Sequence, residues 1–236
     1  MQVEVLDLIR FFIGVAVLGY ACYTDLKTRM APNFLWLIMG GSGIVLLLIQ
    51  YLSGNLEDLF PLIFVPIIIA IIYALYQVGL IFGGADAKAI MSLSLLTPFW
   101  PSLHGFPNHV SIMPFPWVIF SNSIIIFLLI PPFLLVYNAL KGEIEFPFAL
   151  LGYRMSIEEA KKRFVWPLEK VVDGKRKLIL IPEDFDTTPL LEELEKMGFR
   201  RIWVTPKIPF MVPLLAGFII SYFHGDIIFS IADAFM

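Results

Sequence analysis

The sequence has little charge and almost no cysteine. Of its 236 residues, 58% are hydrophobic and only 16% are Asp, Glu, Lys or Arg, whereas about a quarter of the residues in soluble domains are charged. The single cysteine, Cys22, excludes an intramolecular disulfide and a zinc site built from cysteines. The small net charge of −3 gives no reason to expect nucleic-acid binding. These shortages indicate an integral membrane protein.

Histidine is also scarce. The three histidines, His104, His109 and His224, do not have the spacing of metal ligands. The most hydrophilic part of the chain, residues 142–206, contains neither His nor Cys, so it offers no pair of a nucleophile and a histidine. We therefore expect neither a metal site nor a cofactor.

The basic residues are very unevenly distributed. Of the 17 Lys and Arg residues, 13 lie between Lys141 and Lys207, and none lies at positions 30–87 or 89–140. A charged block of this kind, set between long apolar stretches, indicates a soluble domain inserted into a membrane protein.

Six apolar segments are candidates for membrane helices, which need about 20 apolar residues each. The fourth is short for a full span, and Pro131-Pro132 predicts a kink in the fifth. The predicted fold is therefore a polytopic α-helical membrane protein with six transmembrane helices and a small cytoplasmic α+β domain inserted before the last helix. The helices are expected at 6–23, 33–51, 59–81, 87–99, 114–140 and 209–231, and the domains at 1–141, 142–206 and 207–236.

The inserted domain has its own helix and strand signals. Ser156 and Glu159 form a capping box at the start of a helix. Asp173-Gly174 predicts the turn of a β-hairpin, and Thr188 is the expected N-cap of a second helix. These signals predict a small α+β fold.

Basic residues predict how the chain crosses the membrane, because Lys and Arg are retained on the cytoplasmic side. Lys27 and Arg29 place the first loop inside, and Lys88 and the basic block place their segments inside as well. The loops 52–58 and 100–112 lack Lys and Arg and are expected outside. Both termini are then outside, and Arg10 is the one basic residue that does not fit.

Two acidic residues, Asp25 and Asp86, fall at the cytoplasmic depth of the membrane in this topology. Ionisable groups at the membrane are candidates for function. Two carboxylates that share a site hold one proton between them, so that one can activate water while the other polarises a carbonyl group. Gly83 and Gly84 precede Asp86 and allow the backbone to approach a substrate closely.

Each of these residues also has a simpler interpretation. Asp86 could be only the N-cap of the fourth helix, and Asp25 could be an ordinary charge at the membrane surface. Lys88 could anchor the cytoplasmic face, tune the pKa of Asp86 or orient the loop. Arg29 and Asn33 are interpreted as a loop anchor and a helix start. The joint pattern favours a catalytic pair.

The stretch "GGADAK" resembles the GxGD signature of membrane aspartyl proteases. Gly83 matches the first glycine, Asp86 the catalytic aspartate, and Lys88 the lysine that is typical of the prepilin peptidase branch. Ala85 stands where the second glycine is usual, which is a departure of one methyl group.

The first loop, "DLKTRMAPN", resembles the same branch. Asp25, Arg29, Pro32 and Asn33 match its pattern, and the two stretches stand in the order that the family uses. With six helices and a domain before the last one, the chain resembles the archaeal preflagellin peptidase family.

This resemblance implies a multi-pass aspartyl endopeptidase of the cell membrane. Its substrates would be preflagellin or other type IV pilin-like precursors, from which it would remove a short basic leader peptide at the cytoplasmic face. Asp25 and Asp86 would be catalytic, and Gly83, Gly84, Ala85, Lys88, Arg29 and Asn33 would shape the site.

Other functions are weighed against this one. A protease of the presenilin or signal-peptide-peptidase type usually has more spans and a Tyr-Asp motif, of which "YTD" at 23–25 is a loose echo. A proton-coupled carrier would favour inverted repeats and acids at the bilayer midplane, and a membrane scaffold gives no reason for two matched acids. The oligomeric state is not specified by the sequence.

Overall fold

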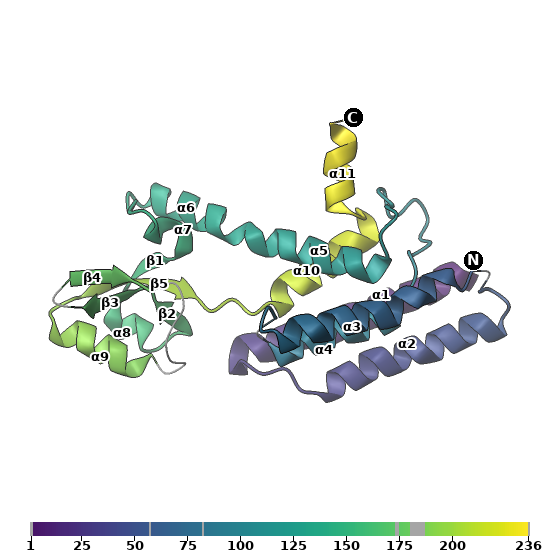
Figure 1. The fold of residues 1–236 in the computed structure, drawn as a ribbon, viewed down its shortest axis with the longest axis horizontal. Coiled ribbons are helices and arrows are strands. Elements are labelled where there is room, and N and C mark those ends of the chain that lie inside the picture. The colour runs from purple at the N-terminus through teal and green to yellow at the C-terminus, as the bar shows by residue number, and fades with distance from the viewer. Residues whose placement is uncertain (1, 57, 82, 173–174, 180–186, 236) are drawn as a thin grey trace. The chain divides into compact units, whose positions relative to one another are not determined.

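A computed structural model describes the chain except at residues 1, 57, 82, 173–174, 180–186 and 236 (Figure 1). The chain forms two compact units. The first, here called the helical unit, joins Met1–Phe127 to Pro209–Met236, and the second, here called the β unit, is Leu128–Ile208.

The helical unit is built from apolar helices and one short 3-10 turn. Three stretches within it are long and apolar enough to cross a membrane, Val3–Thr28, Phe34–Leu52 and Phe60–Gln77, and a fourth, Phe115–Leu140, begins in it and continues into the sequence of the β unit. The described elements are α1 (Gln2–Thr28), α2 (Phe34–Leu52), η1 (Phe60–Ile63), α3 (Phe64–Gln77), α4 (Gly84–Leu96), α5 (Phe115–Leu128), α10 (Met211–Phe223) and α11 (Ile227–Ala234).

The number of membrane spans predicted from the sequence is supported only in part. The first, second, third and fifth predicted helices coincide with the four long ones. α4 and α10 have 13 residues each, which is shorter than the hydrocarbon thickness of a bilayer requires. The chain is therefore a mostly helical membrane protein with four long apolar helices, and the six-span arrangement stays a prediction.

The last predicted helix, 209–231, is not continuous, and that expectation was wrong. α10 ends at Phe223, Gly225 has a φ of 91°, and α11 begins at Ile227. Asp226 caps α11, because its Oδ1 accepts hydrogen bonds from the backbone of Ile228 and Phe229. A glycine in the left-handed region followed by an N-capping aspartate stops one helix and starts another.

The predicted kink in the fifth helix is confirmed. α5 ends at Leu128 and α6 (Ile130–Leu140) begins after Leu129. Pro131 and Pro132 occupy the first turn of α6, and proline has no N–H to continue the hydrogen bonds of the preceding helix. The apolar stretch nevertheless continues through the break to Leu140.

The core of the helical unit lies between α1, α2, α3, α4, α5 and α10. α2 and α4 approach most closely at Gly43, where an added Cβ would overlap the backbone carbonyl of Leu95. Small residues at helix interfaces allow such an approach in membranes. This packing sets the position of α4 against α2, and α1 also contacts both helices.

A buried polar network lies at the N-terminal end of α1. Asp7 and Arg10, three residues apart on α1, form an ion pair of 2.8 Å. Arg10 also donates to Oε1 of Gln50 on α2 at 2.7 Å, and Asp7 accepts from the backbone of Ser102 at 2.9 Å. Because Arg10 is neutralised inside the fold, its disagreement with the distribution of the other basic residues has a structural reason.

The β unit combines α6 with two small sheets. Besides α6, the described elements of this unit are α7 (Phe148–Leu151), β1 (Tyr153–Ser156), α8 (Ile157–Ala160), β2 (Val165–Pro167), β3 (Glu169–Val172), β4 (Lys175–Leu178), α9 (Thr188–Lys196) and β5 (Arg201–Pro206). In the larger sheet the strand order is β1-β5-β2, and both pairings are antiparallel. In the smaller sheet β3 pairs with β4, also antiparallel. The domain boundaries 142–206 stay a prediction.

Two local predictions in this unit can be compared with the structure. Ser156 is the N-cap of α8 and its Oγ accepts from the backbone of Glu159 at 3.2 Å, as the capping box predicted. The N-cap of α9 is Thr187 and not the predicted Thr188. Thr188 and Pro189 are the first two residues of the helix, where a proline is tolerated. The β3–β4 pairing agrees with the predicted hairpin, whose turn at 173–174 lies outside the described residues.

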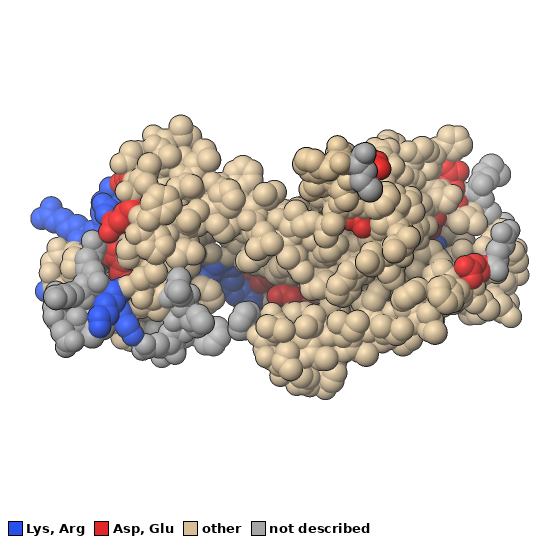
Figure 2. All heavy atoms as spheres, turned by 45° about the horizontal axis from the view of Figure 1, so that its top comes forward, with Lys and Arg blue, Asp and Glu red and all other residues tan. Residues whose placement is uncertain are grey.

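Most of the basic residues belong to the β unit. Figure 2 shows Lys and Arg mainly at one end of the view, with a second group near its middle, whereas most of the visible surface carries neither acidic nor basic residues. In the sequence, 13 of the 17 basic residues lie between Lys141 and Lys207. The uncharged surface of the helical unit, with many exposed Leu, Ile and Phe side chains, is the surface that a membrane helix presents to lipid.

Candidate active site

Asp25 lies in the last turn of α1, and its side chain is half-buried. The helix ends at Thr28, and the backbone N–H of Arg29 donates to the carbonyl oxygen of Asp25 at 2.9 Å. Arg29 has a φ of 59°, which turns the chain out of the helix. Asp25 is thereby held at the end of a long apolar helix.

Asp86 lies at the N-terminal end of a helix, whereas Asp25 lies at a C-terminal end. Gly83 is the N-cap of α4, and Asp86 is the third residue of the helix. The interpretation of Asp86 as the N-cap was therefore wrong. An acidic side chain at this position is still favoured, because it faces the unpaired N–H groups of the first turn.

Gly83 leaves room for the Asp86 carboxylate. Gly83 is extended, with φ −92° and ψ 114°. A Cβ built on it would overlap Oδ2 of Asp86. The carboxylate therefore folds back over the glycine, and the absence of a side chain at position 83 sets where the acid lies.

The two carboxylates interact electrostatically. Asp86 lies outside the four long apolar helices; burial raises its pKa to about 7, and the negative charge of Asp25 contributes to the same rise. α1 packs directly on α4, and Ala21 and Ala87 belong to one core. The two acids that were selected by their predicted membrane depth are thus coupled electrostatically in the structure.

A hydrogen bond joins the helix of Asp86 to the end of the loop that follows the helix of Asp25. Nζ of Lys88 donates to Oδ1 of Asn33 at 2.8 Å. Asn33 is the N-cap of α2, but its side chain makes no capping hydrogen bond there. Of the roles considered for Lys88, this contact supports the orientation of the loop.

The neighbouring motif residues have separate surroundings. The hydroxyl of Tyr76, at the end of α3, lies 3.4 Å from where a Cβ of Gly84 would be. Ala85 is half-buried and packs against the core, so the methyl group that departs from the GxGD pattern is accommodated. No sequence motif marked Tyr76 as a neighbour of the site.

Arg29 carries a positive charge close to Asp25. Burial lowers the pKa of Arg29, and the negative charge of Asp25 opposes this change. The guanidinium Nε is enclosed, although the side chain as a whole is only half-buried. The site therefore contains a cation on the Asp25 side.

The chemistry available at this site is that of carboxylates. Across the described part of the chain, no group of three or more His, Cys, Asp or Glu side chains could hold a metal ion. An acid with a pKa near 7 beside a second carboxylate can give and take protons at neutral pH.

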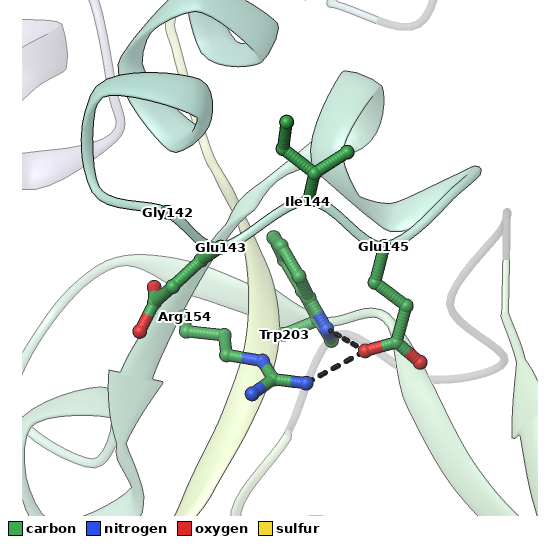
Figure 3. Close-up of a pocket in the computed structure, with 6 residues that line it drawn as sticks. All are labelled: Gly142, Glu143, Ile144, Glu145, Arg154 and Trp203. Carbon is green, nitrogen blue, oxygen red and sulfur yellow. Dashed lines mark hydrogen bonds and ion pairs between the residues drawn. The ribbon is translucent and has the colours of Figure 1, made fainter.

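A cavity of about 350 Å³ lies elsewhere, within the β unit (Figure 3), and is lined by Gly142, Glu143, Ile144, Glu145, Arg154 and Trp203. Oε2 of Glu145 accepts from Arg154 at 2.6 Å and from the indole of Trp203 at 3.0 Å. Glu143 pairs with Arg201 at 2.6 Å. Because these charges compensate one another, we interpret the cavity as part of the domain's structure.

Comparison with known families agrees with the arrangement of the chain. Residues 12–140, which include both aspartates, match the type IV leader peptidase family. Residues 145–227 match the family described as archaeal peptidase A24 C-terminus, type II. Both matches are to peptidases, which goes against the carrier and scaffold alternatives.

Individual relatives are similar over nearly the whole chain. A preflagellin peptidase of Methanococcus voltae is 31% identical, covering 95% of this chain and 98% of that protein. A preflagellin peptidase of Methanocaldococcus jannaschii is 28% identical, covering 95% and 97%. A prepilin peptidase of Methanothermobacter thermautotrophicus is 34% identical over 58% of this chain and 37% of its own length.

Proposed function

The chain belongs to the type IV leader peptidase family, and from this premise we propose that it is a membrane aspartyl endopeptidase. Its substrates are preflagellin or other type IV pilin-like precursors, from which it removes the short basic leader peptide. The names of its relatives, preflagellin peptidase and prepilin peptidase, support this class of substrate.

One observation carries the aspartyl mechanism. The charge of Asp25 contributes to raising the pKa of Asp86, so the two acids are close enough for the ionisation of one to oppose that of the other. They come from separate helices, and the hydrogen bond between Lys88 and Asn33 joins the segments beside them. A pair of this kind retains one proton near neutral pH.

The proposed reaction uses that proton and one water molecule. The ionised carboxylate removes a proton from water, whose oxygen attacks the carbonyl carbon of the scissile peptide bond. The protonated carboxylic acid donates to the carbonyl oxygen as negative charge develops there. The carbon–nitrogen bond then breaks, the leaving nitrogen takes up the proton that the first carboxylate had removed, and a hydroxyl of the intermediate returns its proton to the second carboxylate.

The position of both acids at helix ends suits a substrate that enters from the membrane surface. In the predicted topology this is the cytoplasmic face, where a basic leader precedes the hydrophobic helix of the precursor. The lipid bilayer is then the second partner, because it holds the helix of the substrate beside the site.

A cleavage assay tests the proposal. Membranes that contain the wild type, Asp25→Asn or Asp86→Asn are mixed with a pilin-like precursor, and the shortened product is followed on a gel. We expect cleavage by the wild type alone, since Asn keeps the size of Asp but cannot share the proton. Cleavage by either variant at the wild-type rate would exclude the two-aspartate mechanism.

A further inference from the structure

Arg29 has an unusual backbone conformation for its residue type. Among the described residues other than glycine, it alone has a positive φ, of 59°. Left-handed backbone is unfavourable for a side chain with a Cβ and is commonly occupied by glycine at helix ends. An arginine at this position indicates that its side chain is needed there.

The backbone of Arg29 is joined to Asp25 directly. Its N–H donates to the Asp25 carbonyl oxygen at 2.9 Å, which closes the last turn of α1. This bond places the two residues one helical turn apart, and the charge of Asp25 acts on the half-buried guanidinium. Lys27, the other cation of this turn, lies over the ring of Tyr23 at 5.7 Å.

The surroundings of Asp86 differ from those of Asp25. Burial and the negative charge of Asp25 raise the pKa of Asp86 to about 7. Lys88, the cation nearest to it in sequence, is bonded to Asn33. Among the described residues, the thiol of Cys22 on α1 also interacts with the charge of Asp25, and it brings no positive charge.

The helix ends alone would favour the opposite distribution of charge. Asp25 is at the C-terminal end of α1, where the helix dipole disfavours a negative charge, whereas Asp86 is at the N-terminal end of α4, where it is favoured. A cation next to Asp25 is therefore required if Asp25 is to be the ionised member of the pair. Arg29 is placed to supply it.

We propose that Arg29 is a positioning residue that keeps Asp25 ionised, so that Asp25 is the base that activates water and Asp86 is the acid that protonates the carbonyl oxygen. This assignment rests on the proposed peptidase function. It adds which aspartate is the base, which is the acid, and which side chain makes the two differ.

The test is the pH dependence of kcat/KM for a pilin-like precursor, measured with the full chain in detergent. Arg29→Lys retains the charge, whereas Arg29→Gly removes it and suits the left-handed backbone, so loss of folding is not expected. Lys27→Gln is the matched control, because it removes a charge two residues away that lies over Tyr23.

We expect the low-pH limb of the profile to move up by roughly one pH unit in Arg29→Gly, which is the size expected for loss of an adjacent cation. Cleavage below that limb then falls by about tenfold and recovers at higher pH. Arg29→Lys and Lys27→Gln are expected to keep the wild-type profile.

Three results would overturn the assignment. One is that Arg29→Gly lowers cleavage equally at every pH, and another is that its profile is unchanged. The third is that Lys27→Gln moves the limb as far as Arg29→Gly does, which would make the effect one of general surface charge. Failure of the two-aspartate proposal itself would give a different result, namely no cleavage by the wild type or full cleavage by Asp25→Asn.

Discussion

Lys88 donates a hydrogen bond of 2.8 Å to Asn33, and this bond joins α4 near its beginning to the N-cap of α2. Asp86 lies two residues before Lys88 on α4, and Asn33 follows the loop that begins after Thr28, at the end of the helix that carries Asp25. The bond therefore connects the helix of Asp86 to the loop that follows the helix of Asp25. It is exposed, so its effect on stability is expected to be small and its effect on geometry larger.

Loss of this bond is expected to reduce cleavage. Lys88→Met and Asn33→Ala should each lower kcat/KM by about tenfold, because a misplaced catalytic group is less effective even when it is present. The double variant should be no worse than the more impaired single one. Multiplying effects in the double variant would show that the two residues act independently.

Gly83 and Gly84 form a matched pair for mutation to alanine. A Cβ at Gly83 overlaps Oδ2 of Asp86, whereas a Cβ at Gly84 lies 3.4 Å from the hydroxyl of Tyr76, which is an ordinary van der Waals distance. We expect Gly83→Ala to displace Asp86 and lower kcat by at least about tenfold, with Gly84→Ala close to the wild type. Equal effects of the two substitutions would contradict the described position of Asp86.

The raised pKa of Asp86 has a consequence for stability. Because its pKa rises from 3.8 to about 7 on folding, the ionised form disfavours the folded state, and this unfavourable contribution grows between pH 4 and pH 7. Asp86→Asn should therefore increase the free energy of unfolding at pH 8, by at most about 4 kcal/mol at about 1.4 kcal/mol per pKa unit.

Thermal unfolding of the wild type and Asp86→Asn in detergent at several pH values measures this effect. The control is the difference between the same two proteins at low pH. The gain of Asp86→Asn over the wild type should shrink toward pH 4 and disappear below the unfolded-state pKa of 3.8, where Asp86 is protonated in both states. A gain that does not depend on pH would mean that ionisation of Asp86 is not its cause.

The buried network of α1 predicts a large loss of stability. Arg10→Met leaves Asp7 as an uncompensated charge, and breaking a buried ion pair in this way is expected to lower the free energy of unfolding by about 3–5 kcal/mol. Asp7→Asn combined with Arg10→Met should recover most of that loss. If the double variant is less stable than Arg10→Met alone, the pair is not the source of the effect.

Much of the helical unit could be predicted from the sequence, because apolar length and the lack of charge are local properties. The electrostatic coupling of Asp86 to Asp25 agrees with their selection as a pair, which was based on a predicted topology with both acids at one membrane depth. Their distance within that plane depends on how α1, α2 and α4 pack, which a single sequence does not specify.

The errors have local causes. The break after α10 depends on Gly225 with positive φ and on the cap by Asp226, and both were hidden within an apolar stretch. The bond from Arg10 to Gln50 joins residues 40 positions apart on different helices, so no short pattern reveals it. The interpretation of Asp86 as an N-cap was wrong, because the structure places Asp86 two positions after the first residue of α4.

The most direct test of the account is the titration of Asp86 in the presence and absence of the Asp25 charge. Infrared difference spectra of the wild type against Asp86→Asn isolate the carboxylic acid band of Asp86, and the same difference is recorded in an Asp25→Asn background. The account predicts a midpoint of about pH 7 with Asp25 present and a clearly lower midpoint without it. The same midpoint in both backgrounds would contradict the claim that the two aspartates share one site.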